Sequence, residues 1–297
     1  MSTIGIGIPV FNDYVLTGHL LDSIFLYTER SDINKIIVID DGSNEEYRDS
    51  LRKVCKCRDV EIITNDTNLG VPKSWNKLVK ELNTDYLILL NNDTVVWNGW
   101  LKAIKYALEN NSDVGTVSLP TILVARCDVH KIIHDDANKR HVEILNPLNK
   151  TKRDNTFNLP EGRDPTRIMS PIGCSFAFSR KMFDKVMGFN EIYKYFYEEV
   201  DFGISLYGMK HPSVILPCPH IYHIWGATFE SNMQIDAQGI MSESRSKFIS
   251  KFGMDQMELY RRLDHKFDTK VKYLDCEGNE KEVLLNYTYS PESGIEW

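Results

Sequence analysis

Short apolar runs alternate with amphipathic segments through the first 120 residues of the chain. Four runs have the length of buried strands and end at polar residues, at positions 4–10, 35–39, 60–63 and 86–90. Segments with apolar residues at helical spacing follow them, at positions 14–27, 45–56, 72–82 and 97–110. This alternation predicts an α/β fold with a mostly parallel central sheet and helices on both faces.

The pattern weakens after a further predicted strand at 114–119. Residues 121–167 are polar and locally basic, and we expect a long insertion there, since long loops are often functional lids. A strand is expected at 168–178, containing Gly173, followed by helices at 181–186 and 198–207. Short strands at 213–216 and 220–223, a helical segment at 230–262 and a hairpin within 270–297 complete the predicted elements.

Polar residues follow the first four predicted strands where each strand ends. They are Asn12 and Asp13 and the segments 40–43, 65–70 and 91–93. The carboxyl ends of parallel strands lie at one edge of a sheet, where ligands of such sheets bind. Because Mg²⁺ and Mn²⁺ prefer oxygen ligands and bridge carboxylates to phosphates, Asp93 is a candidate metal ligand. A simple turn is the alternative, since Asn and Asp favour turns.

This crevice lacks a glycine loop of the kind that binds phosphate. Gly5 and Gly7 lie inside the first predicted strand rather than after it, so the dinucleotide-binding fingerprint is not met. The phosphates of a nucleotide bound here would need a metal ion.

Composition excludes several classes of protein. The chain has 297 residues, of which 42% are hydrophobic and 26% charged, as in ordinary soluble proteins. Its net charge of −7 makes direct binding to nucleic acid unlikely, and no apolar run reaches the ~20 residues of a transmembrane segment. The N-terminus lacks the basic segment of a signal peptide. We therefore expect a protein of the cytoplasm, or of a host cytoplasm.

Six cysteines are scattered along the chain, at positions 55, 57, 127, 174, 218 and 276. Cys55 and Cys57 are too close together for half of a zinc site. Cys218, His220 and His223 have the look of a metal site, but no second pair of cysteines completes it. We expect reduced, mostly structural cysteines.

Five motifs follow one another along the chain: Ile8-Pro9-Val10-Phe11-Asn12, Asp40-Asp41-Gly42-Ser43, Asn68-Leu69-Gly70, Asn91-Asn92-Asp93-Thr94 and Gly99-Trp100-Leu101. Their order and spacing resemble those of family 2 glycosyltransferases of the GT-A fold, which are inverting, and are most similar to the rhamnosyltransferase-like branch. The resemblance covers about residues 4–230. It implies a GT-A domain at 1–230, with a nucleotide-sugar-binding half at 1–120 and an acceptor and catalytic half at 121–230. A helical and hairpin extension would occupy 231–297.

The resemblance implies a donor site for a UDP- or dTDP-linked sugar. Asp40 or Asp41 would accept a hydrogen bond from the pyrimidine ring. The other nucleotide-sugar-binding residues would be Pro9, Phe11, Asn12, Asn68, Gly70, Asn91 and Asn92. Asp93 and His223 would bind Mn²⁺ or Mg²⁺, and His220 competes with His223 for this role. The family often has an earlier Asp where Asn91 and Asn92 stand here.

The segment 195–202 resembles the family's Glu-Asp-x-Asp motif, which opens a helix. By register Glu199 is the catalytic base, Glu198 is the nearest alternative, and Asp201 is a structural cap or orienting group. The alternative interpretation is that acidic residues simply favour a helix N-terminus. On the acceptor side, Gly173 would leave room for sugar, and Trp225 belongs to a His-x-x-Gly-x-Thr segment.

The expected function is metal-assisted transfer of a sugar to a carbohydrate or other hydroxyl-bearing acceptor, with residues 121–167 covering or selecting that acceptor. A nucleotidyltransferase also combines a parallel sheet, carboxylates and a metal, but it would want a basic glycine-rich loop after the first strand. A catalytically silent nucleotide-sugar-binding protein is the other alternative, because Asn91, Asn92 and Glu199 depart from the family pattern.

Overall fold

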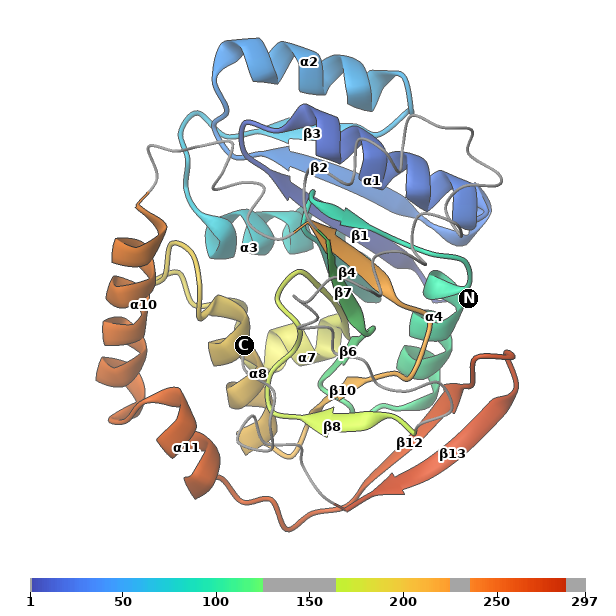
Figure 1. Cartoon of the computed structure of the whole chain (residues 1–297), viewed down its shortest axis with the longest axis vertical. Coiled ribbons are helices and arrows are strands. Elements are labelled where there is room, and N and C mark those ends of the chain that lie inside the picture. The colour runs from blue at the N-terminus through green and yellow to red at the C-terminus, as the bar shows by residue number, and fades with distance from the viewer. Residues whose placement is uncertain (1, 125–163, 225–235, 287–297) are drawn as a thin grey trace.

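An eight-stranded sheet forms the centre of the computed structural model, which describes residues 2–124, 164–224 and 236–286 (Figure 1). Its strand order is β3-β2-β1-β4-β9-β6-β10-β8. The strands are β1 (Ile4–Val10), β2 (Lys35–Asp40), β3 (Glu61–Thr64), β4 (Tyr86–Leu90), β6 (Thr116–Ser118), β8 (Thr166–Ile168), β9 (Ser175–Ser179) and β10 (Ser213–Ile215). The first four strands pair in parallel, whereas β9 and β8 run antiparallel to their neighbours. The predicted α/β fold with a mostly parallel sheet is confirmed.

Helices cover both faces of this sheet. They are α1 (Tyr14–Tyr27), α2 (Glu45–Lys56), α3 (Val71–Leu82), α4 (Trp100–Asn110), α7 (Arg180–Lys185) and α8 (Glu198–Gly208), with a short 3-10 helix at Arg30–Asp32. Alternate residues of each strand enter two separate cores. In β4, Ile88 packs in the core that contains α1 and α4, and Leu87 packs in the core that contains α3 and α8.

The two glycines of β1 let α3 approach the sheet closely. A Cβ at Gly7 would lie 3.0 Å from Leu89 Cδ2 and 3.2 Å from Leu78 Cδ1, and one at Gly5 would lie 2.6 Å from Thr84 Oγ1. These glycines therefore serve helix packing and not phosphate binding, in agreement with the sequence analysis.

A smaller sheet, with strand order β5-β11-β7, lies beyond the end of β4. Its strands are β5 (Thr94–Val95), β11 (Ile221–Ile224) and β7 (Thr121–Val124). In the antiparallel pairing of β5 with β11, His223 is opposite Thr94. This register brings His223 next to the candidate metal ligand Asp93.

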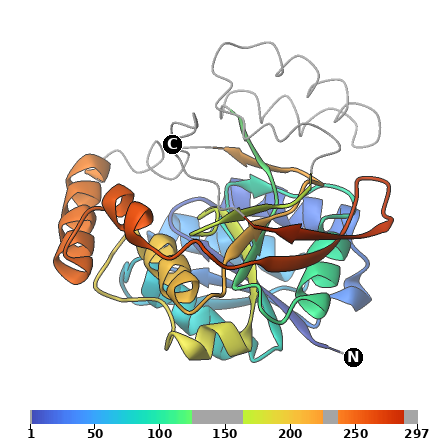
Figure 2. The same ribbon diagram turned by 90° about the horizontal axis from the view of Figure 1, so that it is seen from below.

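The C-terminal part contains α10 (Ala237–Phe252), α11 (Gln256–Arg262) and the antiparallel pair β12 (Thr269–Leu274) and β13 (Glu280–Leu285). Figures 1 and 2 show α10 and α11 beside α8, and the hairpin next to α4. Val271 and Leu285 of the hairpin enter the core of the main domain. The buried Arg167 guanidinium donates to the carbonyls of His265 and Leu285. The helical segment predicted at 230–262 is confirmed from Ala237 onward, with a break at Gly253, whose φ is 75°, and its first residues, 230–235, lie outside the described residues. The predicted hairpin is confirmed by β12 and β13.

Two of the predicted elements have other boundaries in the structure. The single strand expected at 168–178 is two strands, β8 and β9, because the chain turns between them where Pro171 lacks a backbone N–H. Gly173 lies in this turn and not in a strand. The helix expected from residue 97 begins at Trp100, after Gly99 with a φ of 81°. Most of the expected insertion, residues 125–163, lies outside the described residues.

The expectation of reduced cysteines was wrong for one pair. Cys218 and Cys276 form a disulfide that joins the segment before β11 to the hairpin turn, across 58 residues of sequence. Cys55, Cys57 and Cys174 are free. The sequence pattern gave no sign of the pairing, because only the docking of the hairpin brings the two cysteines together.

Removing this disulfide is expected to destabilise the protein. For a loop of this length, the chain-entropy model gives a loss of about 4 kcal/mol in the free energy of unfolding for Cys276→Ser. Urea unfolding would measure the loss, with the exposed free thiol variant Cys57→Ser as the control. If the intact masses before and after reduction do not differ by two hydrogens, the disulfide does not form.

None of the helices within residues 2–124, 164–224 and 236–286 has the length and apolarity that a membrane span requires.

Candidate functional site

Buried polar side chains gather at the carboxyl edge of the parallel strands. Val10 at the end of β1 pairs with Asp40 at the end of β2, and β4 ends beside β1. The buried polar residues at this edge are Asn12, Asp40, Asp41, Asn65, Asn92 and Asp93. Burying polar groups is costly unless they have partners, so their partners show what each one does.

Asp40 and Asp41 are adjacent but have separate partners. Asp40 accepts from the backbone N–H of Ser43 at 2.9 Å and from Arg48 Nε of α2 at 3.2 Å. Asp41 accepts from Asn65 Nδ2 at 2.8 Å and from the backbone N–H groups of Leu69 and Gly70, at 3.0 and 2.9 Å. Asp41 therefore fixes the loop of residues 65–70, and Asp40 is linked to α2.

Asn12 connects the loops that follow β1 and β2. Its backbone N–H donates to Ser43 Oγ at 2.9 Å, and its Oδ1 accepts from the backbone N–H of Asn44 at 2.8 Å. Its φ of 53° is in the left-handed region. Pro9 and Phe11 beside it are partly exposed at the same edge, where the resemblance expects the nucleotide.

Asn91 and Asn92 have different surroundings. Asn92 is buried and donates from Nδ2 to the carbonyl of Asp13, at 3.2 Å, so it ties the end of β4 to the start of α1. Asn91 is partly exposed, and its backbone N–H donates to the carbonyl of Cys174 at 2.9 Å. Asn91 is thus the better placed of the two to contact a ligand.

Asp93 and His223 face each other. Asp93 Oδ1 lies 3.3 Å from His223 Nε2, and this buried oxygen makes no hydrogen bond of good geometry with the described residues. Burial disfavours protonation of His223, but Cys174 and Asp93 beside it outweigh this effect and raise the histidine pKa well above its usual value.

A carboxylate oxygen and an imidazole nitrogen in contact fit a divalent ion such as Mn²⁺. The described residues contain no group of three or more metal-ligating side chains. The described residues would therefore supply two ligands, and phosphate and water could complete the set, as is usual where such ions meet a nucleotide. Of the two competing histidines, His223 is the one that contacts Asp93.

Glu198 and Glu199 occupy the first turn of α8, and each has a buried Oε2 without a hydrogen-bond partner among the described residues. Burial, together with the neighbouring charge of Glu199, raises the pKa of Glu198 well above its usual value. Burial also raises the pKa of Glu199. Two buried carboxylates in one turn, each with one oxygen that lacks a hydrogen bond, are costly for folding and suit proton transfer.

The turn of residues 172–174 connects the two parts of the site. A Cβ at Gly173 would lie 2.8 Å from Glu199 Oε1, so the space at this glycine is taken by the carboxylate and is not left open for sugar. The next residue, Cys174, contacts His223 and accepts from the backbone of Asn91. One turn therefore borders the candidate base and the candidate metal ligands. Cys174 was not predicted as a site residue, and its only signal in the sequence was its place next to Gly173.

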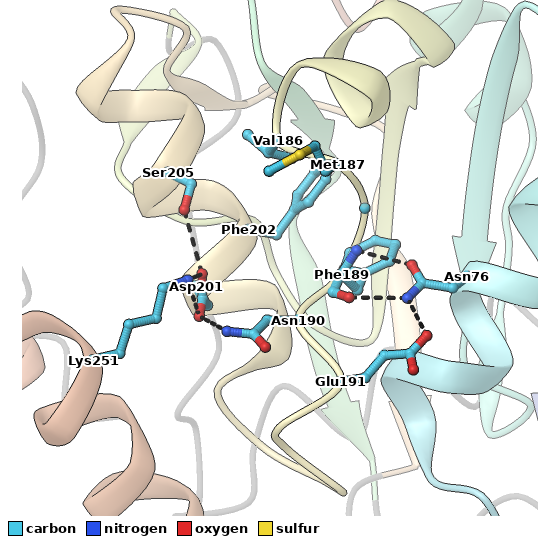
Figure 3. A pocket seen from close by; sticks show the side chains of 11 residues that line it. Asn76, Val186, Met187, Phe189, Asn190, Glu191, Asp201, Phe202, Ser205 and Lys251 are labelled. Carbon is cyan, nitrogen blue, oxygen red and sulfur yellow. Dashed lines mark hydrogen bonds and ion pairs between the residues drawn. The ribbon is translucent and has the colours of Figure 1, made fainter.

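Asp201 holds α8 in place. Its carboxylate lines a cavity of about 400 Å³, and Figure 3 shows Asn190 and Lys251 pointing toward it. Asn190 Nδ2 donates to the carboxylate at 3.0 Å, and Lys251 Nζ of α10 lies 2.6 Å away. Tyr193 also donates its hydroxyl, at 2.9 Å. The carboxylate thus joins α8, α10 and the preceding loop, as expected of an orienting group. Trp225 lies outside the described residues.

Neutralising Glu198 is expected to stabilise the fold above acidic pH. Because the pKa of Glu198 is raised in the folded state, proton binding to this carboxyl stabilises the fold. This contribution is complete below the unfolded pKa of about 4.3 and is lost as the pH rises through the folded pKa. Glu198→Gln should therefore melt at a higher temperature than the wild type at pH 8, and the gap should close towards pH 4. Melting curves at several pH values test this, with the exposed Glu46→Gln as control. A gap that does not change with pH would exclude this cause.

Comparison with known proteins shows a match over most of the chain. A family model described as Glycosyl transferase family 2 matches residues 6–187. No curated protein sequence matches the chain.

Three solved structures share the fold. GalNAc-T7 with UDP, GalNAc and Mn²⁺ is 15% identical, with a TM-score of 0.58 over 76% of this chain and 44% of that chain. The mannosyltransferase PcManGT from Pyrobaculum calidifontis, in complex with GDP-Man and Mn²⁺, is 11% identical, with a TM-score of 0.54 over 88% and 78%. S. aureus TarS 1–349 is 14% identical, with a TM-score of 0.53 over 84% and 72%. The chain thus spans less than half of GalNAc-T7 and more than two thirds of the other two.

Proposed function

The chain belongs to glycosyl transferase family 2 and has the GT-A fold, and we propose that it is an inverting glycosyltransferase of the hexosyltransferase type. It would move a sugar from a UDP- or dTDP-linked donor to a hydroxyl of a carbohydrate or other acceptor. The observation that carries the proposal is the turn 172–174, which borders both Glu199 and the Asp93–His223 pair. The rhamnosyltransferase-like branch stays a prediction.

The donor would bind at the carboxyl edge of β1, β2 and β4. Asp40 and Asp41 would contact the nucleobase. Pro9 and Phe11 would lie beside that ring, and Asn91 would lie nearer the sugar. Asp93 and His223 would hold Mn²⁺ or Mg²⁺, whose charge would stabilise the leaving diphosphate. Two of the similar structures contain Mn²⁺ with UDP or GDP-Man, which supports a donor and an ion of this kind.

Glu199 would act as the base. An acceptor hydroxyl is a weak nucleophile until its proton is removed, and a carboxylate with a raised pKa is suited to removing it near neutral pH. As the hydroxyl oxygen bonds to the anomeric carbon, its proton passes to Glu199 and the bond from that carbon to the diphosphate breaks. Attack opposite the leaving group inverts the anomeric configuration. Glu198 is the alternative base.

The acceptor is expected on the side of the turn 172–174 and Trp225, with residues 121–167 helping to select it. A cytoplasmic location stays a prediction, and the Cys218–Cys276 disulfide argues for an oxidising compartment instead.

Nucleoside diphosphate release from a panel of UDP-, dTDP- and GDP-sugars with Mn²⁺ tests the proposed function. We expect release from at least one donor, faster with the right acceptor. Binding without release by any donor would indicate a catalytically silent nucleotide-sugar-binding protein. Pyrophosphate release from a nucleoside triphosphate and a sugar phosphate would indicate a nucleotidyltransferase.

A further inference from the structure

Two residues far apart in the sequence join the donor side of the site to the segment that carries the candidate base. Asn68 Nδ2 donates to the Tyr195 hydroxyl at 2.8 Å, and that hydroxyl lies 3.0 Å from Asn68 Oδ1, to which it donates. Asn68 belongs to the loop of residues 65–70, and Tyr195 lies four residues before Glu199. We call this pair the clasp, and residues 194–197 the strap.

The donor end of the clasp is fixed by a residue of the candidate nucleotide site. Asp41 accepts from the backbone N–H groups of Leu69 and Gly70, directly after Asn68. Asn65, at the start of the same loop, also donates to this carboxylate. A ligand that contacts Asp41 therefore acts on a group that sets the position of Asn68.

The strap is held closely along its length. At its start, Val71 donates its backbone N–H to the carbonyl of Lys194 at 2.9 Å, and a Cβ at Gly70 would lie 2.6 Å from that carbonyl oxygen. On its other side, the buried Ser244 of α10 donates to the carbonyl of Tyr195 at 2.7 Å. The strap thus lies between the donor loop and α10.

The end of the strap has an unusual backbone. Phe196 and Tyr197 have φ values of 66° and 71°, in the left-handed region that bulky residues rarely adopt. Such conformations persist only where the surrounding structure enforces them, and they cluster at functional sites. Glu198 and Glu199 follow immediately, so a change in the strap moves the carboxylates directly.

We propose that the Asn68–Tyr195 clasp is a positioning device, through which the donor-bound loop holds the strap and sets the place of the Glu199 carboxylate. This inference rests on the proposed function of the site. Tyr195 acts on the chemistry through Glu199, without contact with the reacting atoms. Because a displacement of about 1 Å can slow an enzyme a hundredfold, one lost hydrogen bond is enough for a large effect on turnover.

Single and double variants separate positioning from simple stabilisation. We expect Tyr195→Phe and Asn68→Ala each to lower kcat about tenfold or more, and the double variant to be no slower than the slower single variant. Tyr195→Phe should leave the donor KM within about threefold of the wild type, since the hydroxyl is tied to Asn68. The control is Tyr273→Phe, which removes a hydroxyl that donates to Asp164 at 2.8 Å, in the hairpin and outside the site. It should lower the melting temperature without this loss of kcat. Unchanged kcat, additive losses, or an equal loss in Tyr273→Phe would overturn the clasp.

Hydrogen exchange tests the same inference without turnover. UDP with Mn²⁺ should slow amide exchange of residues 194–200 in the wild type, and this protection should be lost in Tyr195→Phe at matched occupancy of the nucleotide site. Protection that survives in Tyr195→Phe, or nucleotide binding without protection of the strap, overturns the clasp but leaves the proposed function standing. A wild type that binds no nucleotide from the panel overturns both.

Discussion

Glu199→Gln is expected to lower sugar transfer by about a hundredfold or more at saturating donor, the usual scale of general-base catalysis. Glutamine keeps the size of the side chain and its contact with Gly173, but it cannot take a proton. Donor affinity should stay nearly unchanged, because the Glu199 side chain contacts Gly173 and glutamine keeps this contact. Initial rates of transfer at saturating donor, with donor titrations alongside, measure both quantities.

Glu198→Gln is the matched control for this variant, since it makes the same change one residue earlier. The two side chains leave a helix about 100° apart, so only one of them faces the acceptor. Glu198→Gln should be milder. A near-normal rate for Glu199→Gln would remove this residue from the mechanism, and a collapse confined to Glu198→Gln would shift the assignment by one residue.

Asp93→Ala is expected to abolish the effect of divalent ions on nucleotide binding and to lower transfer by about a hundredfold or more. The reason is that Asp93 Oδ1 is the one buried carboxylate oxygen at the strand edge left without a hydrogen bond among the described residues. Asp93 is one of the two ligands that the described residues offer, so its loss removes half of that set. Calorimetry with UDP and dTDP, with and without Mn²⁺ or Mg²⁺, measures the effect.

His223→Ala should have the same kind of effect as Asp93→Ala, and His220→Ala provides the matched control on the same segment. If His220→Ala is the damaging change and His223→Ala is silent, the observed contact with Asp93 is not the metal site. Equal nucleotide affinity in the wild type before and after thorough chelation would remove the metal from the account altogether.

The sequence predicted those features that depend on local pattern. The short apolar runs of β1 and β4 predicted buried strands, and the polar residues after each strand identified the edge where Asp40 and Asp93 lie. The family resemblance placed Glu199 at the start of a helix, where the structure also has it.

Features that depend on distant parts of the chain were not predictable in this way. The contact of His223 with Asp93 needs the β5–β11 pairing, and only the resemblance suggested it. The clasp joins Asn68 and Tyr195, which are 127 residues apart in the sequence, and the sequence around neither residue indicates the contact. The turn at Gly173 lies inside an apolar run and was not predicted, because the periodicity and hydrophobicity of a run do not indicate where a buried strand ends.

The stereochemistry of the product tests the central claim, single displacement with Glu199 as base, most directly. The measurement is proton NMR of the product at early times, before mutarotation, with a donor that the enzyme uses and water or the acceptor as nucleophile. It identifies the anomeric configuration of the transferred sugar. Single displacement predicts a sugar of inverted configuration from the wild type and a greatly reduced rate from Glu199→Gln. A product that retains the configuration of the donor would contradict it.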